Sequence, residues 1–102
     1  ISNPQIILPY VPEYAEPVWH GFGIRCKRRD ELEAFLKEKS IGTNKHYPIP
    51  IHLQECYRDL GFKKGDYPVA EEISETELSL PMYYGMTDEE VLYVINRVNA
   101  FK

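Results

Sequence analysis

The 102-residue sequence lacks the features that mark several large classes of protein. No stretch approaches the roughly 18 consecutive apolar residues that a membrane helix needs. The N-terminal segment Ile1–Pro4 lacks the charged and apolar regions of a signal peptide. Basic residues are not in excess, because 12 Lys and Arg stand against 16 Asp and Glu and the net charge is −4. We therefore expect a soluble, cytoplasmic protein that does not bind membranes or nucleic acid.

Residues in known catalytic or metal-binding patterns are also scarce. The two cysteines, Cys26 and Cys56, are too few for a disulfide framework and form no C-x-x-C pair, so we interpret both as small apolar side chains. His52 and Glu55 have a spacing that suits a metal site on a helix, but a third ligand is missing. No nucleophile elbow and no glycine-rich phosphate loop occurs. We therefore predict no catalytic residue, no bound metal and no complete active site within the chain.

Hydrophobic residues make up 43% of the chain, which is enough to build one core in a domain of this length. The first 17 residues carry four prolines, which predicts an extended linker that can pair as an edge strand near residues 6–8. Residues 18–102 then form the domain. Because the chain opens on Ile1, we expect a processed or trimmed piece of a longer protein.

Residue periodicity predicts an α+β fold in which helices cover one face of a small, mostly antiparallel sheet. The best strand runs from Val18 to Cys26, and a shorter one covers residues 78–82. Four helices are expected. The first covers residues 31–39, with Asp30 before it and Gly42 after it, and the second covers residues 53–60, with an apolar stripe of Leu53, Cys56, Tyr57 and Leu60. The third begins at Pro68 and buries Val69, Ala70 and Ile73, and the last begins with a capping box of Thr87 and Glu90 and buries Val91, Val94, Ile95, Val98 and Phe101.

The two faces of the predicted strand over residues 18–26 differ in character. Mostly apolar side chains on one face alternate with small or polar ones on the other: Val18, His20, Phe22, Ile24 and Cys26 against Trp19, Gly21, Gly23 and Arg25. Glycines in the middle of a strand usually mark a bulge or the close approach of another group. We therefore expect the second face either to meet a ligand or to have lost a covering element.

The pair His46-Tyr47 is the candidate site that local chemistry favours. An imidazole that can donate and accept hydrogen bonds stands beside a phenol, and Pro48 and Pro50 stiffen the backbone that follows. Stiff backbone that holds polar groups in place suits substrate positioning. From these residues alone, an equally good interpretation is that Tyr47 packs on the domain and His46 is merely exposed. His20, on the more apolar strand face, is more simply a hydrogen-bonded, half-buried histidine than a catalytic one.

Six short segments form a recognisable set within a likeness that extends from about Pro9 to Phe101: Val18-Trp19-His20, Ile24-Arg25-Cys26, His46-Tyr47-Pro48-Ile49-Pro50-Ile51-His52, Gly61–Pro68, Leu78-Ser79-Leu80-Pro81 and Met86-Thr87-Asp88. Together they resemble the C-terminal domain of the DegT/DnrJ/StrS family of sugar aminotransferases, which depend on pyridoxal phosphate (PLP). The most specific segment, His-Tyr-Pro-Ile-Pro-x-His-x-Gln, runs from His46 to Gln54. It most resembles the branch that makes 3-amino-3,6-dideoxyhexoses on a dTDP carrier.

The resemblance implies the small C-terminal domain of a fold-type I aminotransferase, which covers the sugar side of the cleft. In such enzymes PLP carries an amino group from glutamate to a keto-sugar nucleotide, here a dTDP-3-keto-6-deoxyhexose. The Schiff-base lysine belongs to a large domain that this chain lacks, so the chain alone is expected to bind no PLP and to be inactive. The implied partners are that large domain of the same parent chain, the sugar nucleotide, and a second parent chain in a homodimer.

The resemblance also carries the candidate site residues. His46 and Tyr47 match the family's substrate-contact pair, and His20 falls near the same cleft. No residue of the chain matches a catalytic, cofactor-binding or metal-binding position of the family.

Four positions depart from the family pattern by replacing bulky apolar residues: Gly21, Gly23, Asn44 and Lys45. An apolar sheet face without its partner domain invites aggregation, so these departures suggest a domain altered to live alone. The sequence therefore leaves two hypotheses. The chain is the C-terminal domain of a sugar aminotransferase, or it is a free-standing or engineered binding module that reuses the fold without its chemistry.

Overall fold

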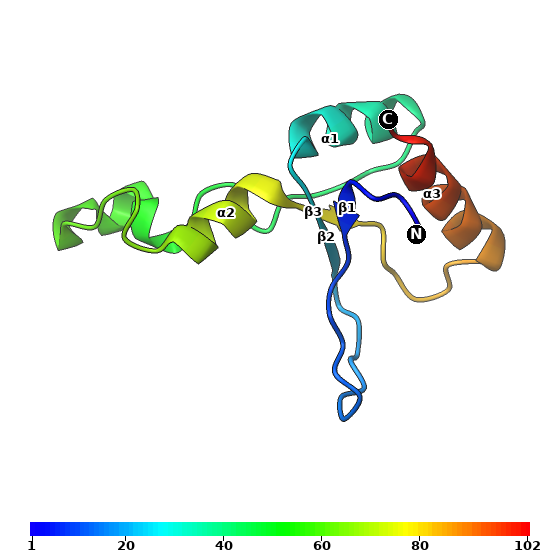
Figure 1. Ribbon diagram of the computed structural model, residues 1–102, viewed down its shortest axis with the longest axis horizontal. Coiled ribbons are helices and arrows are strands. Elements are labelled where there is room, and N and C mark those ends of the chain that lie inside the picture. The colour runs from blue at the N-terminus through cyan, green and yellow to red at the C-terminus, as the bar shows by residue number, and fades with distance from the viewer.

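The computed structural model describes all residues, 1–102, as a small sheet with helices packed on one face, which confirms the predicted α+β fold (Figure 1). Three antiparallel strands pair in the order β1 (Ile6–Ile7), β2 (Phe22–Cys26) and β3 (Glu77–Leu80). The helices are α1 (Arg29–Glu38), α2 (Pro68–Thr76) and α3 (Asp88–Ala100), with two 3₁₀ helices, η1 (Ile51–Leu53) and η2 (Glu55–Leu60). None of them combines the length and the apolar content that crossing a membrane requires.

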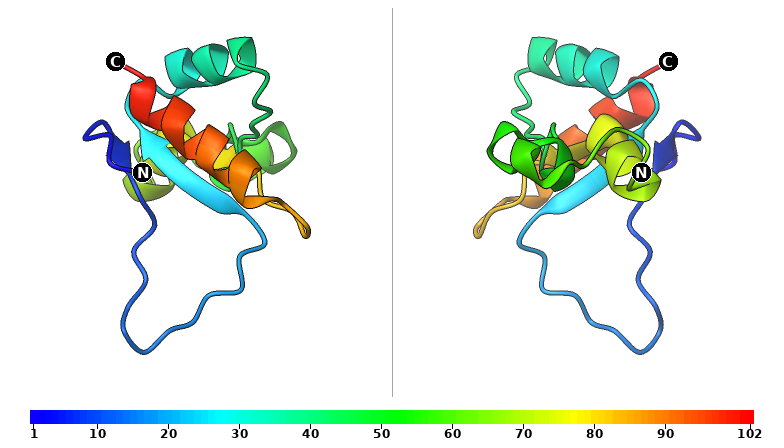
Figure 2. Two further views of the ribbon diagram at one scale, coloured as in Figure 1. Left: turned by 90° about the vertical axis from the view of Figure 1, so that its right-hand side faces the viewer. Right: turned by 90° about the vertical axis from the view of Figure 1, so that its left-hand side faces the viewer.

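The core lies between the sheet and the helices α1 and α3, which pack on the same side of it (Figure 2). Residues opposite each other in antiparallel strands point to the same side, and β2 pairs Ile24 with Leu78. Leu32 and Leu36 of α1 and Val98 of α3 close over this pair, and all five side chains are fully buried. Burial of each such side chain stabilises the fold by about 1.5–3 kcal/mol.

The first residues of the chain are tied to this core. The side-chain amide of Asn3 donates to the carbonyl oxygens of Val98 (2.9 Å) and Phe101 (2.8 Å) at the end of α3. Ile6 pairs with Cys26 at the edge of the sheet and is buried. The edge strand expected near residues 6–8 is therefore present, and residues 1–7 belong to the packed domain.

β2 is shorter than the strand predicted from Val18 to Cys26. It begins at Phe22, and the preceding residues 8–21 form a loop that projects from the sheet, where Val18 is 95% exposed (Figure 1). The reason is the lack of a partner, because β3 ends at Leu80, directly opposite Phe22. Pro81 follows immediately, so Met82, predicted in this strand, lies outside it.

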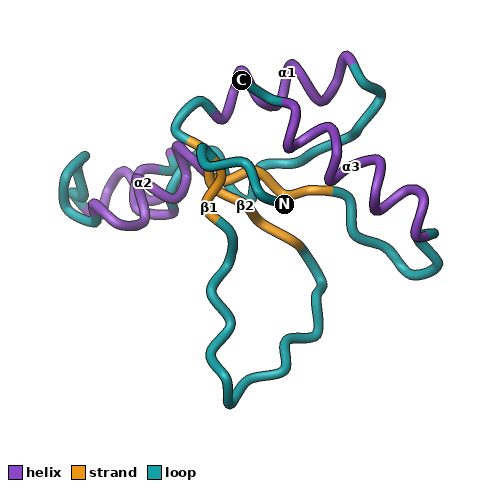
Figure 3. The backbone as a smooth tube through the Cα atoms, turned by 45° about the vertical axis from the view of Figure 1, so that its right-hand side comes forward, coloured by secondary structure: helices purple, strands orange, loops and turns teal.

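Residues 48–67 form an arm that extends away from the sheet beside α2 (Figures 1 and 3). The predicted α-helix over residues 53–60 is wrong, because this part of the arm forms η1 and η2 instead. η2 ends at Gly61, which has the left-handed conformation (φ 76°) that the sequence indicated there. A helix of eight residues is marginal by itself, and no core of this chain lies beneath the stripe of Leu53, Cys56, Tyr57 and Leu60.

α2 begins at Pro68 as predicted, but its predicted inner face is wrong. Val69, Ala70 and Ile73 are exposed, whereas Glu71 and Ser74 are buried. The helix runs directly into β3 and projects beyond the end of the sheet (Figure 3). Its buried residues, Glu71 and Ser74, are polar. An apolar helix face is thus left uncovered.

α3 begins with the predicted capping box. Thr87 Oγ1 accepts from the backbone N–H of Glu90 (3.2 Å), and the Glu90 carboxylate accepts from the backbone N–H of Thr87 (2.8 Å). Val94, Val98 and Phe101 of the predicted stripe are buried, Ile95 is half-buried, and Val91 stays 38% exposed.

The ends of α1 differ from the prediction. Asp30 lies inside the first turn, because the helix begins at Arg29. At the other end it is Ser40, not Gly42, that takes the left-handed conformation (φ 60°). The backbone N–H of Ser40 and that of Ile41 donate to carbonyl oxygens of the last turn (both 3.0 Å), which is the usual left-handed helix termination.

Replacing Ser40 with glycine is expected to stabilise the protein, because glycine adopts this conformation without a steric cost. We expect Ser40→Gly to raise the free energy of unfolding, measured by urea denaturation, by about 0.5–1 kcal/mol. Gly42→Ala is the matched control, since a Cβ there would meet no atom within 4 Å, and it should leave stability near that of the unmodified chain. A loss with Gly42→Ala and no gain with Ser40→Gly would show that Gly42 ends the helix after all.

Candidate functional site

The face of the sheet opposite the core is polar where β2 pairs with β3. Gly23 lies opposite Ser79, and Arg25 lies opposite Glu77, so these four residues share the face that is turned away from the core. Both Ser79 and Glu77 are only 8% exposed. The bare face that the sequence indicated at Gly23 is therefore filled by side chains from β3.

His46 lies against this polar face, held by its backbone and its ring. The backbone of Asn44 pairs with that of Ser79, through N–H to carbonyl bonds of 2.8 and 3.1 Å. The His46 ring places Nδ1 2.8 Å from Ser79 Oγ and Nε2 3.0 Å from Asn44 Nδ2. The backbone N–H of His46 donates to Glu77 Oε2 (2.7 Å), and Ser79 Oγ donates to Glu77 Oε1 (2.5 Å). Three side chains thus position one imidazole.

The position of the Glu77 carboxylate explains the glycine at position 23. A Cβ at this position would lie 3.0 Å from Glu77 Oε1, so glycine leaves the space that the carboxylate occupies. For Gly21, a Cβ would meet no atom within 4 Å, and nothing in the structure explains the glycine.

The other two departures from the family pattern also make local contacts. Asn44 bonds the His46 ring, and Lys45 Nζ forms ion pairs with Glu33 (2.7 Å) and Asp30 (3.0 Å) of α1. Hydrogen bonds to Glu33 and then to Asp30 raise the pKa of Lys45. Both polar residues therefore serve contacts within the domain.

His20 and His46 line one open groove beside β3, with a volume of about 330 Å³, which we call the His46 groove. His20 comes from the loop 8–21 and is exposed, so the interpretation as a half-buried histidine on a strand face is wrong. The absence of a strand partner for this part of the loop is the cause, and it leaves His20 free to face the groove. Thr43 and Met82 are among the other residues of its walls.

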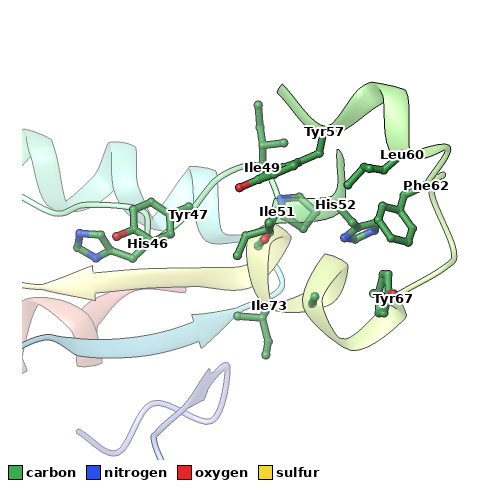
Figure 4. Close-up of a pocket in the computed structure, with 13 residues that line it drawn as sticks. His46, Tyr47, Ile49, Ile51, His52, Tyr57, Leu60, Phe62, Tyr67 and Ile73 are labelled. Carbon is green, nitrogen blue, oxygen red and sulfur yellow. The ribbon is translucent and has the colours of Figure 1, made fainter. Parts of the chain in front are cut away.

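Tyr47 lines a second, larger hollow of about 670 Å³ between the arm and α2, which we call the arm hollow (Figure 4). Its ring is 66% exposed and lies edge-on to the His46 ring, with the two centroids 5.4 Å apart. Apolar side chains such as Ile51 and Ile73 make up most of the walls. His46 lines both the groove and the hollow, so the structure brings the three predicted site residues around two adjoining depressions.

A buried polar contact fastens the arm to α2. His52 Nε2 lies 2.8 Å from Glu71 Oε1, and the two carboxylate oxygens of Glu71 accept from the backbone N–H of Gly65 (2.8 and 3.0 Å). The Tyr67 ring packs edge-on against His52, with centroids 4.9 Å apart. The hydrogen bond to His52, followed by that from Gly65, lowers the pKa of Glu71. His52 is therefore a structural residue whose partner is Glu71 rather than Glu55, and no group of three ligands could hold a metal ion.

No lysine of the chain fits the role of forming an imine with PLP. Six of the seven, Lys27, Lys37, Lys39, Lys63, Lys64 and Lys102, lie at the surface with exposed or half-buried side chains. The seventh, Lys45, has a raised pKa, whereas a nucleophilic amine must be neutral and needs a lowered one. The residues present do not by themselves form a PLP site.

Comparison with known proteins assigns the chain to a family. The sequence pattern of the DegT/DnrJ/EryC1/StrS aminotransferase family matches residues 2–99. The chain belongs to this family. Aminotransferases of this kind use PLP, which is consistent with the resemblance that the motifs indicated.

Individual relatives agree with this assignment. The dTDP-3-amino-3,6-dideoxy-α-D-galactopyranose transaminase of Aneurinibacillus thermoaerophilus is 39% identical over 101 residues, which cover 99% of this chain and 27% of that enzyme. The pleiotropic regulatory protein of Geobacillus stearothermophilus is 44% identical over 84 residues, or 82% of this chain and 23% of that protein. The crystal structure of S. venezuelae DesV superimposes with a TM-score of 0.91 at 38% identity, over 96% of this chain and 26% of DesV. The chain spans about a quarter of the relatives it matches.

Sequence reasoning missed Glu77, Ser79 and Glu71 as the partners of the two histidines. A signal was present for two of them, since Glu77 and Ser79 alternate with buried leucines and must share one face of β3. The register that sets them opposite Arg25 and Gly23 could not be derived from that alternation.

The contact between His52 and Glu71 predicts how the arm responds to acid. A carboxyl group whose pKa is lowered by folding stabilises the fold above its ordinary value of 4.5, and this contribution is lost as pH falls through the lowered value. We therefore expect the amide signal of Gly65, followed by NMR from about pH 7 to about pH 2, to show its inflection below that ordinary value. Glu71→Gln is the control and should abolish the inflection. A midpoint at or above 4.5 would contradict the contact.

Proposed function

We propose that the chain is the C-terminal, substrate-covering part of a PLP-dependent sugar-nucleotide aminotransferase. The parent enzyme would transfer an amino group from glutamate to a keto-deoxysugar nucleotide, such as a dTDP-3-keto-6-deoxyhexose, as a cytoplasmic homodimer. The large domain of the same parent chain would bind the cofactor. In this assignment His46, Tyr47 and His20 contact the sugar, and residues 18–102, joined by the segment 1–17, bind and orient it without taking part in the chemistry.

The fixed position of His46 is the observation that carries this proposal. Its ring is hydrogen-bonded on both nitrogens, and it stands where the His46 groove and the arm hollow adjoin. A binding group that is already held in place loses little conformational entropy when substrate binds. The geometry therefore suits a residue that positions substrate, and Tyr47 and His20 lie beside it for the same purpose.

The shape of the chain supports its being one part of a larger protein. Its accessible surface is 7745 Å², whereas a folded monomer of this mass exposes roughly 6,000 Å². Its radius of gyration is 15.5 Å, against about 13 Å for a compact domain of this length. The excess comes from the loop 8–21 and the arm, which both project from the sheet (Figure 1). Surfaces of this kind are suited to contact with another domain.

The alternative, a free-standing or engineered binding module, fits the same surface less well. Val69 and Ile73 of α2 and Ile49 and Ile51 of the arm are more than one-third exposed. Exposed apolar patches of this kind favour association in a protein that works alone. The polar residues Asn44 and Lys45 do not reduce this apolar patch, because they lie outside it and make contacts within the domain.

The test uses a fused enzyme in which this chain replaces the matching quarter of the A. thermoaerophilus transaminase. In this enzyme, His46→Ala should lower kcat/KM of the half-reaction with the sugar nucleotide about tenfold to a hundredfold, because a group of the sugar is left without its hydrogen-bond partner. The half-reaction with glutamate should change much less, since glutamate has no sugar ring. Single-turnover kinetics of each half-reaction separates the two.

Asn3→Ala is the control for general loosening of the domain, since Asn3 holds the end of α3 and lines neither the His46 groove nor the arm hollow, and it should affect both half-reactions alike. Unfused chain, treated with PLP and borohydride, should give no stoichiometric lysine adduct. Equal losses in the two half-reactions of His46→Ala would contradict the assignment of His46.

A further inference from the structure

The two nitrogens of the His46 ring lie in different surroundings. Nδ1 is turned toward the sheet, where its contact with Ser79 is partly buried, and Nε2 is turned to the exposed side, where its partner is Asn44. The orientation of the Asn44 amide is fixed, because its Oδ1 accepts from the backbone N–H of Lys45 (2.9 Å). The Nδ2 group that faces the ring can therefore only donate.

This geometry determines where the ring carries its proton. Nε2 accepts from Asn44, so in the neutral ring the proton is on Nδ1 and is donated to Ser79 Oγ. The Ser79 hydroxyl then donates its own proton to Glu77 Oε1. The chain of donors runs from Asn44 through His46 and Ser79, and it ends on a buried carboxylate that can only accept.

Glu77 acts on His46 at two points. Oε1 accepts from Ser79, which holds the ring, and Oε2 accepts from the backbone N–H of His46 itself. Gly23, on the neighbouring strand, gives this carboxylate room, since a Cβ there would lie only 3.0 Å from Oε1. Glu77 thus holds the backbone of His46 directly and its ring through Ser79, while Asn44 contacts the other ring nitrogen.

We propose that Glu77 is a positioning residue which, through Ser79, fixes the tautomer of His46 so that Nε2 faces the groove as a hydrogen-bond acceptor for a substrate hydroxyl. Asn44 occupies that nitrogen in the free protein, and because Asn44 is exposed, a sugar hydroxyl can take its place. The proposal rests on the function proposed for His46. It adds that His46 accepts the hydrogen bond from the sugar, and that Glu77 and Ser79 act by positioning His46.

The first test is made on the chain as it is. Long-range ¹H–¹⁵N spectra at about pH 8, where an ordinary imidazole is neutral, distinguish a ring nitrogen that carries a proton from one that does not. We expect the proton of His46 on Nδ1. A proton on Nε2 would overturn the proposal, whatever the stability of any variant.

Substitutions then test which residues impose this tautomer. Ser79→Ala and Glu77→Gln should shift the proton toward Nε2, whereas Ser79→Thr, which keeps the hydroxyl, should preserve it on Nδ1. Gly23→Ala should disturb the His46 signals because its Cβ meets the Glu77 carboxylate, and Gly21→Ala, with no atom within 4 Å, should leave them unchanged. Persistence of the Nδ1 proton in both Ser79→Ala and Glu77→Gln would contradict the role of Glu77.

The fused enzyme separates this inference from the proposed function. Ser79→Ala and Glu77→Gln should lower kcat/KM for the amino sugar nucleotide about threefold to tenfold with the glutamate half-reaction unchanged, and Ser79→Thr should restore it. If His46→Ala itself leaves the sugar half-reaction unchanged, the proposed function fails. If His46→Ala impairs it while Ser79→Ala and Glu77→Gln do not, only the positioning role fails.

Discussion

The pairing of β2 with β3 supports both the core and the candidate site, because each residue pair of this register serves one of the two faces. On one face Ile24 and Leu78 are buried beneath α1 and α3. On the other, Gly23 faces Ser79, and Glu77 reaches the space beside Gly23. A shift of one residue would exchange the faces and place Glu77 in the core. The burial of leucines thus fixes the position of the carboxylate that holds His46.

Three of the four departures from the family pattern are explained by contacts within the domain. Their replacement of apolar by small or polar residues suggested a domain altered to live alone. In the structure Gly23 makes room for Glu77, Asn44 bonds His46, and Lys45 joins the segment to α1. The uncovered apolar surface lies elsewhere, on α2 and the arm, where the chain keeps its exposed isoleucines. Three of the four departures thus serve contacts within the domain, and the proposed function would use the separate apolar surface for contact with another part of the parent protein.

Local signals predicted those elements that are stabilised by their own sequence or by the core. The capping box at Thr87 and the stripe through Val94 and Val98 formed as expected, because both depend on residues three or four positions apart. Predicted elements that needed another segment of the chain to pair with or pack against were wrong. The strand from Val18 had none beyond Leu80, and the helix over residues 53–60 had no surface to pack on. Local chemistry and the family resemblance both indicated His46 and Tyr47, whereas the residues on β3 that support His46 depended on a register that one sequence does not reveal.

A crystal structure of the fused enzyme with bound amino sugar nucleotide is the most direct test of the proposal that this chain presents His46 to a sugar. We expect a sugar hydroxyl within hydrogen-bond distance of His46 Nε2, with Asn44 displaced from that nitrogen and the contact from Nδ1 to Ser79 retained. Tyr47 and His20 should border the same sugar. A sugar ring bound away from both the His46 groove and the arm hollow, with the Asn44 contact intact, would contradict the role proposed for His46.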